Sequence, residues 1–341
     1  MPCKPSNTIA TAALLALGVA AACCPARAQQ VSREFQYLQY ARSHVQFAIH
    51  GGRITVVALR TNSFTPPPAD RPGRKEQVGF YYDPADGSAR FHYQLTSTDQ
   101  NWSVLAQTDG RVVAERSPGE RGEGPPSEFV QNPAGPFVLT IGKGDAKKIY
   151  TAPTIWHLLL ARREACRQYV VPLLQVLRPD WRLLEQTDSL EAELLREAKL
   201  GAMPDRRRWD EWVAQLADDR YARREAADAQ LRAAGQAVVP YLTSLRREKL
   251  DAEQQYRIHR IVQSLTGRQV DESPAEVAGA MLADPSVWMI LLERNSPTQR
   301  ELAAAHLARL LGRPIDFNPA ADPATRARQV EALRAVVGRG Q

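Results

Sequence analysis

Residues 137–161 read FVLTIGKGDAKKIYTAPTIWHLLLA, and within this stretch one kind of secondary structure gives way to another. The first part alternates apolar and polar residues on both sides of Gly142-Lys143-Gly144-Asp145, which predicts two strands joined by a hairpin turn. The turn lacks the spacing and the Lys-Ser/Thr ending of a phosphate-binding loop. From Pro153 onward the residues are mostly apolar and favour helix. The stretch therefore predicts that a sheet ends, and helices begin, near Thr151.

Composition changes at the same place. Residues 29–151 contain 12 glycines and 5 leucines, whereas residues 152–341 contain 7 glycines and 26 leucines. Glycine supplies the turns between strands, and leucine at helical spacing supplies helix packing. We therefore expect an α+β fold, with a mainly antiparallel β domain over 29–151 and an all-helical domain over 152–341.

Short β-rich runs bounded by turn residues predict the strands of the first domain. Gly51-Gly52, Asp86-Gly87 and Asp109-Gly110 separate three pairs of these runs, as in tight hairpins. Two polar segments, 66–73 and 117–127, are predicted to be surface loops, and 36–42 a short helix. The predicted strands are 44–50, 53–60, 77–82, 89–95, 102–107, 111–115, 137–141 and 148–150.

Start and stop signals divide the second domain into helices. Asp188, Ser273 and Ser296 each precede a Glu or Gln by three residues, as in a capping box, and Asp322-Pro323 is a cap followed by proline. Gly235, Gly267, Gly312 and Gly338 each follow a periodic stretch, as glycines that end helices do. The predicted helices are 153–177, 188–199, 206–217, 220–234, 236–248, 251–266, 274–283, 285–293, 297–311 and 323–337.

An internal repeat is visible when Trp212 is aligned with Trp288, a shift of 76 residues. Arg224 then matches Arg300, and Leu231 matches Leu307. A further copy places Arg326 seven residues before Leu333, the same Arg-to-Leu spacing. Residues 206–338 resemble HEAT-repeat α-solenoids, whose units are helix pairs of about 40 residues. The spacing of 26 before the last copy is too short for a full pair. The resemblance implies a curved helical platform that binds a protein or peptide, and it implies no catalytic residue.

The first 28 residues predict an export signal. Lys4 precedes an apolar run from Ile9 to Ala22, and Ala26-Arg27-Ala28 places small residues where a signal peptidase cleaves. Cleavage after Ala28 would leave 313 residues with a net charge of +4, in a periplasmic or secreted protein. The alternative is a lipid anchor at Cys23, although the aliphatic residue usual three positions before such a cysteine is missing.

Several classes of protein are disfavoured by the remaining sequence. Cleavage leaves Cys166 as the single cysteine, which excludes an intrachain disulfide. No later stretch stays apolar for about 18 residues, so no transmembrane span is predicted. Residues 29–151 and 152–341 each carry a net charge of +2, which does not favour nucleic-acid binding.

The search for chemistry finds no catalytic, cofactor-binding or metal-binding motif. His44 and His50 share a predicted strand face and could meet His92, but none of the six histidines has the spacing of a helical zinc motif. Cys166 and His157 lie nine residues apart, on opposite faces of a helix. Cys166 instead shares a face with apolar residues, which predicts a buried structural thiol. We therefore expect no cofactor and no metal.

Surface side chains suggest two kinds of binding. Tyr81 and Tyr82 point to opposite faces of a strand, so one of them could join an exposed aromatic platform. The arginines between 206 and 260 alternate with acids, which is typical of a solvated helix surface with local ion pairs. In a HEAT-like pair the second helix commonly lines the concave face. The candidate partner-binding residues on it are Tyr241, Ser244, Arg246 and Arg247.

The function that these features favour is an exported, non-enzymatic interaction or assembly module with a protein or peptide partner. A small-molecule or glycan carrier that uses the β domain is the alternative. A hydrolase whose site is built from residues distant in sequence is a further alternative, and convergent Asp, Glu or His groups in a pocket of the structure would favour it.

Overall fold

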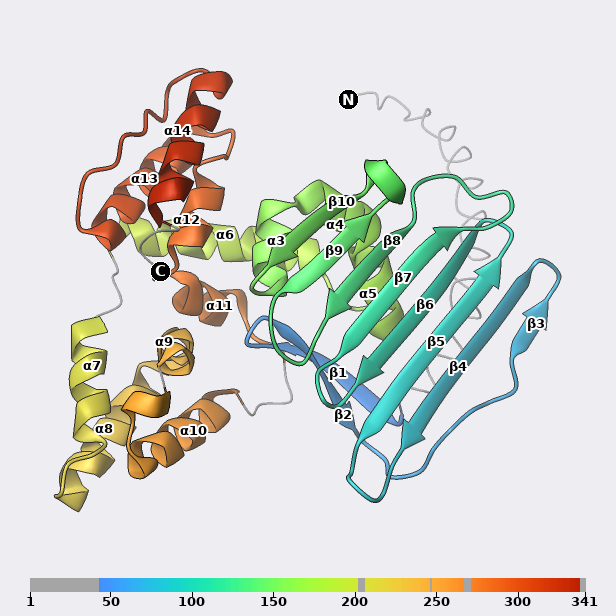
Figure 1. Cartoon of the computed structure of the whole chain (residues 1–341), viewed down its shortest axis with the longest axis horizontal. Coiled ribbons are helices and arrows are strands. Elements are labelled where there is room, and N and C mark those ends of the chain that lie inside the picture. The colour runs from blue at the N-terminus through green and yellow to red at the C-terminus, as the bar shows by residue number, and fades with distance from the viewer. Residues whose placement is uncertain (1–42, 202–205, 246, 267–270, 338–341) are drawn as a thin grey trace, which may run out of the picture.

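The computed structural model describes residues 43–201, 206–245, 247–266 and 271–337. The predicted export signal, Cys23 and the helix predicted at 36–42 lie outside these residues. The fold is α+β, as predicted: an antiparallel β region precedes a helical region (Figure 1). None of the described helices is both long enough and apolar enough to cross a membrane.

Eight strands form one antiparallel meander in which every strand pairs with its neighbours in sequence. A separate hairpin, β1 (Val45–His50) with β2 (Arg53–Ala58), turns at Gly51-Gly52 as predicted. The eight strands are β3 (Ala69–Arg71), β4 (Arg74–Tyr82), β5 (Ala89–Ser97), β6 (Gln100–Gln107), β7 (Val112–Pro118), β8 (Ser127–Gln131), β9 (Phe137–Ile141) and β10 (Lys148–Ala152).

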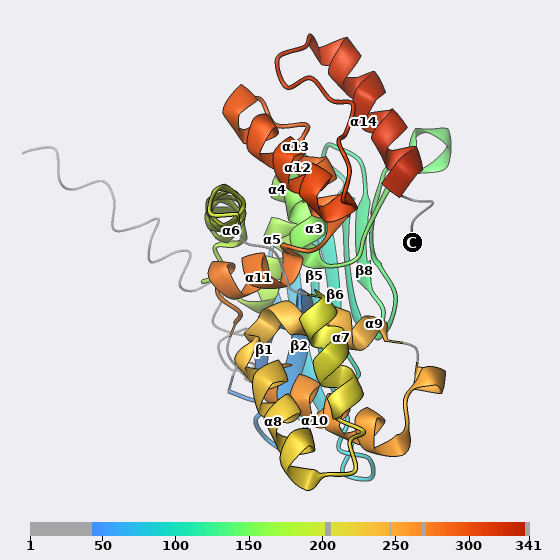
Figure 2. The same cartoon turned by 90° about the vertical axis from the view of Figure 1, so that its left-hand side faces the viewer.

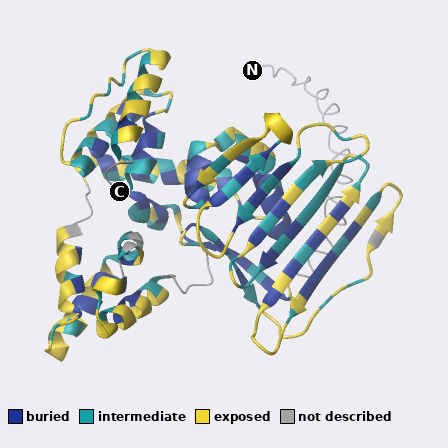
Figure 3. Cartoon of the chain, in the orientation of Figure 1, coloured by how far each residue is buried: buried dark blue, intermediate teal, exposed yellow. Residues whose placement is uncertain are grey.

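Alternation along the strands gives the large sheet one buried face, as the stripes of colour in Figure 3 show. In β5, Phe91 and Tyr93 are buried, whereas Arg90 and Gln94 are exposed. The buried face packs against the β1–β2 hairpin and the helices that follow β10 (Figure 2). Because β1 and β2 lie behind the sheet and not at its edge, their apolar side chains join its core.

Two strands were not predicted. β3 pairs with β4 inside the proline-rich segment 66–73 that was predicted to be a loop, and β8 continues the sheet from Ser127, where the predicted loop 117–127 ends. The pattern of β8 escaped detection because Ser127 and Gln131 are polar residues on the buried face, on either side of Phe129. The hairpin at 142–145 is confirmed, with the 3-10 helix η1 (Gly144–Ala146) between β9 and β10.

The helical region starts as predicted near 153 but divides its first segment in three. α3 ends at Ala161, because the next residue, Arg162, has a non-helical backbone with φ −135° and ψ 46°, and Pro172 lies in the first turn of α5. The helices are α3 (Ile155–Ala161), α4 (Arg163–Tyr169), α5 (Val171–Leu177), α6 (Leu183–Lys199), α7 (Arg206–Gln215), α8 (Tyr221–Ala233), α9 (Val239–Ser244), α10 (Ala252–Thr266), α11 (Pro274–Met281), α12 (Pro285–Leu291), α13 (Pro297–Leu311) and α14 (Pro323–Val337), with 3-10 turns η2 (Gly235–Val238) and η3 (Arg247–Lys249) beside α9.

Two predicted helix starts differ in outcome. Ser273 and Glu276 form the reciprocal capping box that the sequence indicates at the start of α11. The start predicted at Asp188 is wrong, because α6 begins at Leu183 and Asp188 instead pairs with Arg163 at 2.7 Å. Burial of Leu183 against the core extends α6 beyond its local signal.

The repeated arginine has the same local role in three helices. Arg224 donates to the carbonyls of Asp218 and Asp219 at 2.8 and 3.1 Å, six and five residues earlier. Arg300 binds the carbonyls at the same offsets, at 2.6 and 2.7 Å, and Arg326 binds the carbonyl five residues earlier. The leucine seven residues after each arginine is buried. A guanidinium thus binds the carbonyls of the turn before each helix, while the HEAT resemblance stays a prediction.

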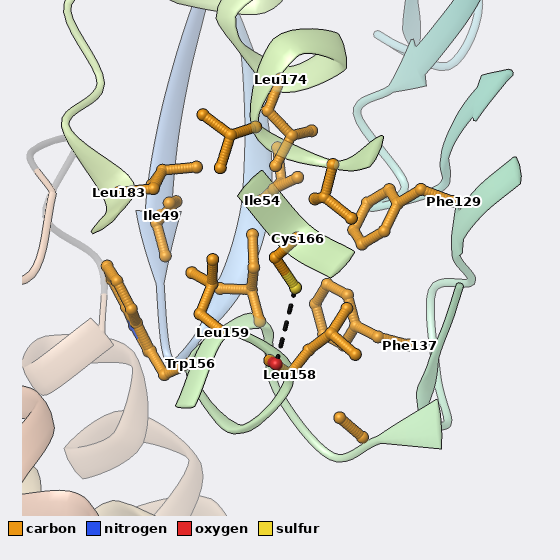
Figure 4. Close-up of a cluster of buried hydrophobic side chains, with 14 of the residues drawn as sticks. Ile49, Ile54, Phe129, Phe137, Trp156, Leu158, Leu159, Cys166, Leu174 and Leu183 are labelled. Carbon is orange, nitrogen blue, oxygen red and sulfur yellow. Dashed lines mark hydrogen bonds between the residues drawn. The ribbon is translucent and has the colours of Figure 1, made fainter. Parts of the chain in front are cut away.

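Two hydrophobic clusters hold the described chain together. The main cluster runs from the sheet through α3–α6 to α11–α14, and a smaller one lies within α7–α10. Cys166 belongs to the main cluster, where its thiol lies 3.5 Å from the carbonyl oxygen of Leu158 (Figure 4). Burial raises the pKa of this thiol to about 12, so the predicted structural cysteine is confirmed as buried and protonated.

Candidate functional site

A cleft of about 830 Å³ lies between the β1–β2 hairpin and the helices α9 and α11. The β6–β7 turn, the start of α3 and parts of α7, α10 and α12 complete its lining. Figures 1 and 2 show α11 beside the hairpin. Val56 and Met281 contribute to the lining from the main cluster, and Trp209 and Val262 contribute from the smaller one. Both clusters therefore share this one cleft.

Asp271 joins the helical region to the outer edge of β1. Its carboxylate accepts the backbone N–H of Ile49 at 2.8 Å and the indole N–H of Trp181 at 3.2 Å. The same carboxylate pairs with Arg178 at 2.7 Å, and both side chains are largely shielded from solvent. Charge-assisted hydrogen bonds of this kind are worth about 1.5–3 kcal/mol each. Asp271 therefore fixes the segment that precedes α11 to the hairpin.

Glu272 makes a second attachment one residue later. Its backbone N–H donates to the carbonyl of Ile49 at 3.1 Å, and its carboxylate accepts the N–H of Gly52 at 2.8 Å and the indole N–H of Trp156. Burial raises the pKa of Glu272, and these hydrogen bonds partly oppose the rise. The carboxyl group of Glu272 thus lines the cleft and already accepts hydrogen bonds from Gly52 and Trp156.

Close packing at Gly52 sets the position of α3. A Cβ at this residue would lie 2.5 Å from Cβ of Thr154, and the φ of +67° is itself in the left-handed region. The carbonyl of Gly52 accepts the N–H of Ile155 at 3.0 Å. Only glycine permits this contact between the hairpin turn and the first residues of α3.

Gln131 holds the other edge of the hairpin. Its amide accepts the N–H of Ile54 and donates to the carbonyl of the same residue, both at 2.8 Å, as a neighbouring strand would. The amide also donates to the carbonyl of Gly110 at 2.6 Å. Gln131 is fully buried, so a polar residue on the inner face of the sheet is explained by these three bonds.

Thr154, His157 and Asp284 form a chain of hydrogen bonds at one end of the cleft. Thr154 Oγ1 lies 2.7 Å from His157 Nδ1, and His157 Nε2 lies 3.1 Å from Asp284 Oδ2. Thr154 also accepts the backbone N–H of His157 at 3.3 Å as the N-cap of α3. Burial acts to raise the pKa of Asp284, but hydrogen bonds from His157 and Ser286 outweigh it and the pKa is lowered. Asp284 is therefore ionised at neutral pH.

This chain has the hydroxyl, imidazole and carboxylate order of a hydrolase triad. A nucleophilic hydroxyl has to be available to a substrate, whereas Thr154 packs against Gly52 and its oxygen caps α3. The structure therefore accounts for Thr154 and His157 as parts of a helix start, and leaves Asp284 as the member of this chain of hydrogen bonds that presents a carboxylate to the cleft.

The predicted candidates are only partly described. Tyr241 lines the cleft, and its hydroxyl donates to Asp210 in α7. Ser244 ends α9, Arg247 begins η3, and Arg246 lies outside the described residues.

The three histidines that could meet on the sheet do not meet. His44 stacks on Phe64 at the buried face, and His50 lines the cleft. His92 lies on the opposite, open face of β5, where burial and Arg90 lower its pKa. Among the described residues, no group of three or more His, Cys, Asp or Glu could hold a metal ion.

Of the two tyrosines considered for an exposed aromatic platform, Tyr81 is the one on the open face of the sheet. Its side chain is 41% exposed, covers Gly79 on its own strand and stacks with Arg90 at 5.5 Å. Phe80 and Phe91, which flank it, are buried. The exposed residue is thus accounted for by packing over a glycine and an arginine.

Sequence reasoning missed Glu272, His157 and Asp284 as lining residues. Asp284 was visible only as a cap before Pro285, and Glu272 only as an acid before the cap Ser273. Their partners lie more than 100 residues earlier in the chain, which no local pattern indicates.

No protein-family model, curated protein or solved structure matches this chain.

Proposed function

We propose that the chain binds a small, largely apolar molecule in the cleft between the β1–β2 hairpin and the helical region. The observation that carries this proposal is the cleft itself, whose volume of about 830 Å³ falls in the range of small-molecule sites. Apolar side chains such as Val56, Val277 and Met281 line it, and a few polar groups converge on it. This arrangement is typical of ligand sites at the junction of two structural units.

The proposed site differs from the one that the sequence predicted for the alternative function of a carrier. The predicted carrier site used the β domain, whereas the cleft takes one wall from the hairpin and the other from α9 and α11. Asp271 and Glu272 support a preformed site, because their hydrogen bonds hold the two walls together. A preformed cleft loses less ordering entropy when a ligand binds.

Nile red, a neutral solvatochromic dye, tests the proposal with the full chain. We expect saturable binding with a blue-shifted emission, and a large loss of affinity in Ala280→Trp, which places an indole in the cleft. The matched control is Ala226→Trp, because Ala226 is an exposed residue of α8 away from the cleft. Absence of saturable binding, or equal binding by both variants, would contradict the proposal.

Protein binding by the helical region is a second function that we propose. Tyr221 in α8 and Tyr256 in α10 are 64% and 57% exposed, on helices that contact each other. Arg224 and Arg260 lie over their rings at 5.6 and 5.7 Å. Exposed tyrosine and arginine are enriched among residues that dominate binding energy at protein interfaces.

Affinity capture from a cell-envelope extract tests this second function. Immobilised wild-type chain should retain a discrete protein that the double variant Tyr221→Ser/Tyr256→Ser does not retain. Both side chains are exposed, so the variant should keep the stability of the wild type to within about 0.5 kcal/mol. Retention of the same proteins by both chains, or of none, would contradict it.

A further inference from the structure

Asp284 places a negative charge at the cleft in which we propose that a ligand binds. Its side chain is 31% exposed, and the side chain within ion-pair distance of it is that of His157. Pro285 and Met281 line the cleft beside it. A carboxylate in such apolar surroundings interacts strongly with any nearby charge, because the local dielectric constant is low.

The carboxylate of Asp284 is contacted by Nε2 of His157, and the tautomer of this imidazole follows from the partner of Nδ1. Thr154 Oγ1 accepts the backbone N–H of His157, and it can donate its own proton to Nδ1 at 2.7 Å. Nδ1 then carries no proton, and Nε2 carries the one that is donated to Asp284. In this tautomer the imidazole is neutral, and the carboxylate of Asp284 keeps its full negative charge.

Among the described residues that line the cleft, the arginine is directed elsewhere. Arg53 donates to the carbonyls of Gly135 and Asn132, and its guanidinium lies 5.0 Å from the centre of the Phe137 ring. Its pKa is lowered by burial. Asp109, in the β6–β7 turn, and Glu272 add two further carboxyl groups to the lining. The cleft thus presents more negative than positive charge to a ligand.

Aromatic residues favour the same sign of ligand charge. Trp156, Trp209 and Tyr241 line the cleft together with the apolar side chains. The face of an aromatic ring attracts cations, and the attraction grows when water is excluded. An apolar cleft with aromatic residues and a carboxylate is therefore suited to a molecule that has an apolar body and a protonated nitrogen.

We propose that the ligand of the cleft is an apolar or aromatic amine whose ammonium group pairs with the carboxylate of Asp284. This inference rests on the proposed ligand-binding function and specifies the charge of the molecule. The ammonium donates a charge-assisted hydrogen bond to Asp284, which already accepts bonds from His157 and from the N–H of Ser286. The apolar body lies against the side chains of α11 and the hairpin.

Three probes of nearly equal size and shape test the charge: 2-naphthylmethylamine, 2-naphthylmethanol and 2-naphthoate. Binding to the full chain is measured by titration calorimetry at pH 7. We expect the amine to bind about tenfold more tightly than the alcohol, which corresponds to about 1.4 kcal/mol, and the carboxylate to bind most weakly. Equal affinities, or tighter binding of the carboxylate, would overturn the inference.

Substitution of Asp284 assigns the charge preference to one residue. Asp284→Asn keeps the size of the side chain and its ability to cap α12, since asparagine is an equally good N-cap. We expect it to weaken binding of the amine by about tenfold and to leave binding of the alcohol unchanged. The matched control is Asp109→Asn, which removes a charge from the same cleft and retains the turn bond to the N–H of Arg111.

The outcomes separate this inference from the function on which it rests. Binding of all three probes with equal affinity, abolished by Ala280→Trp, would support a ligand cleft and overturn the amine. Binding of the amine that is unaffected by Ala280→Trp would overturn both. An amine preference that survives Asp284→Asn and disappears in Asp109→Asn would overturn the role of Asp284.

Discussion

The two hydrophobic clusters use similar helices but differ in what surrounds them. The main cluster joins the sheet to α3–α6 and α11–α14, so its helices pack on several sides. The smaller cluster lies within α7–α10, where its core contains nine buried apolar residues among those that the structure describes. Its contact with the rest of the chain includes the packing of η2 against α11. The same repeated sequence features thus occur in two regions with different surroundings, and both regions line the cleft.

The largest expected difference lies between the two tryptophans related by the internal repeat. Trp288 is fully buried, donates to the carbonyl of Leu282 at 2.9 Å and stacks on His306 at 4.0 Å. Trp212 is half-buried and stacks with Arg208. Trp288→Ala should lower the free energy of unfolding by about 3–5 kcal/mol, and Trp212→Ala by about 1 kcal/mol. Urea denaturation followed by circular dichroism measures both, and equal losses would contradict the comparison.

The second-largest expected effect is a loss of stability of the main cluster at acid pH. His306 is fully buried, and burial, opposed by the carbonyl of Leu282 and reinforced by Arg309, lowers its pKa to about 4. The unfolded histidine titrates near 6.5, so it binds a proton that the folded one rejects. The stability that neutral His306 contributes is present above pH 6.5 and is lost as the pH falls towards 4. The full loss is about 3 kcal/mol.

The variant His306→Gln isolates this titration from that of the carboxylates. The urea midpoint of the wild type should fall further between pH 7 and pH 4.5 than that of the variant. His259, in α10 of the smaller region, is exposed and provides the control His259→Gln. The urea midpoint of this control should change with pH as that of the wild type does. The same pH dependence in all three chains would contradict the role of His306.

Local signals predicted more of the fold than of the site, for a physical reason. Hairpin glycines and helix caps act within a few residues, and Gly51-Gly52, Ser273 and Ser296 lie where the sequence placed them. Where packing overrides a local signal the prediction is wrong, as at Asp188 inside α6. A strand such as β8 is missed when its buried residues are polar but bonded, as Gln131 is.

The cleft depends on contacts that no local pattern encodes. Glu272 meets Gly52 across 220 residues, and Asp284 meets His157 across 127. Each acid is an ordinary residue beside a helix start in the sequence. Their positions become meaningful only when α11 and α12 pack beside the hairpin, so the candidate site could be found only from the fold.

The smallest expected effects concern two alanines at equivalent repeat positions, and they show whether the two regions unfold separately. Ala303 in α13 and Ala227 in α8 are both buried, at 0% and 1% exposure. Glycine in a helix interior costs about 1 kcal/mol relative to alanine, so Ala303→Gly and Ala227→Gly should each lose about that much. Because the residues belong to different clusters, hydrogen exchange should accelerate in α13 for the first variant and in α8 for the second. The double variant should show both changes, with free energies that add to within about 0.5 kcal/mol. Faster exchange in both helices after either single substitution would mean that α7–α10 and the main cluster open as one unit, and that the cleft between them is a rigid feature of a single cooperative fold.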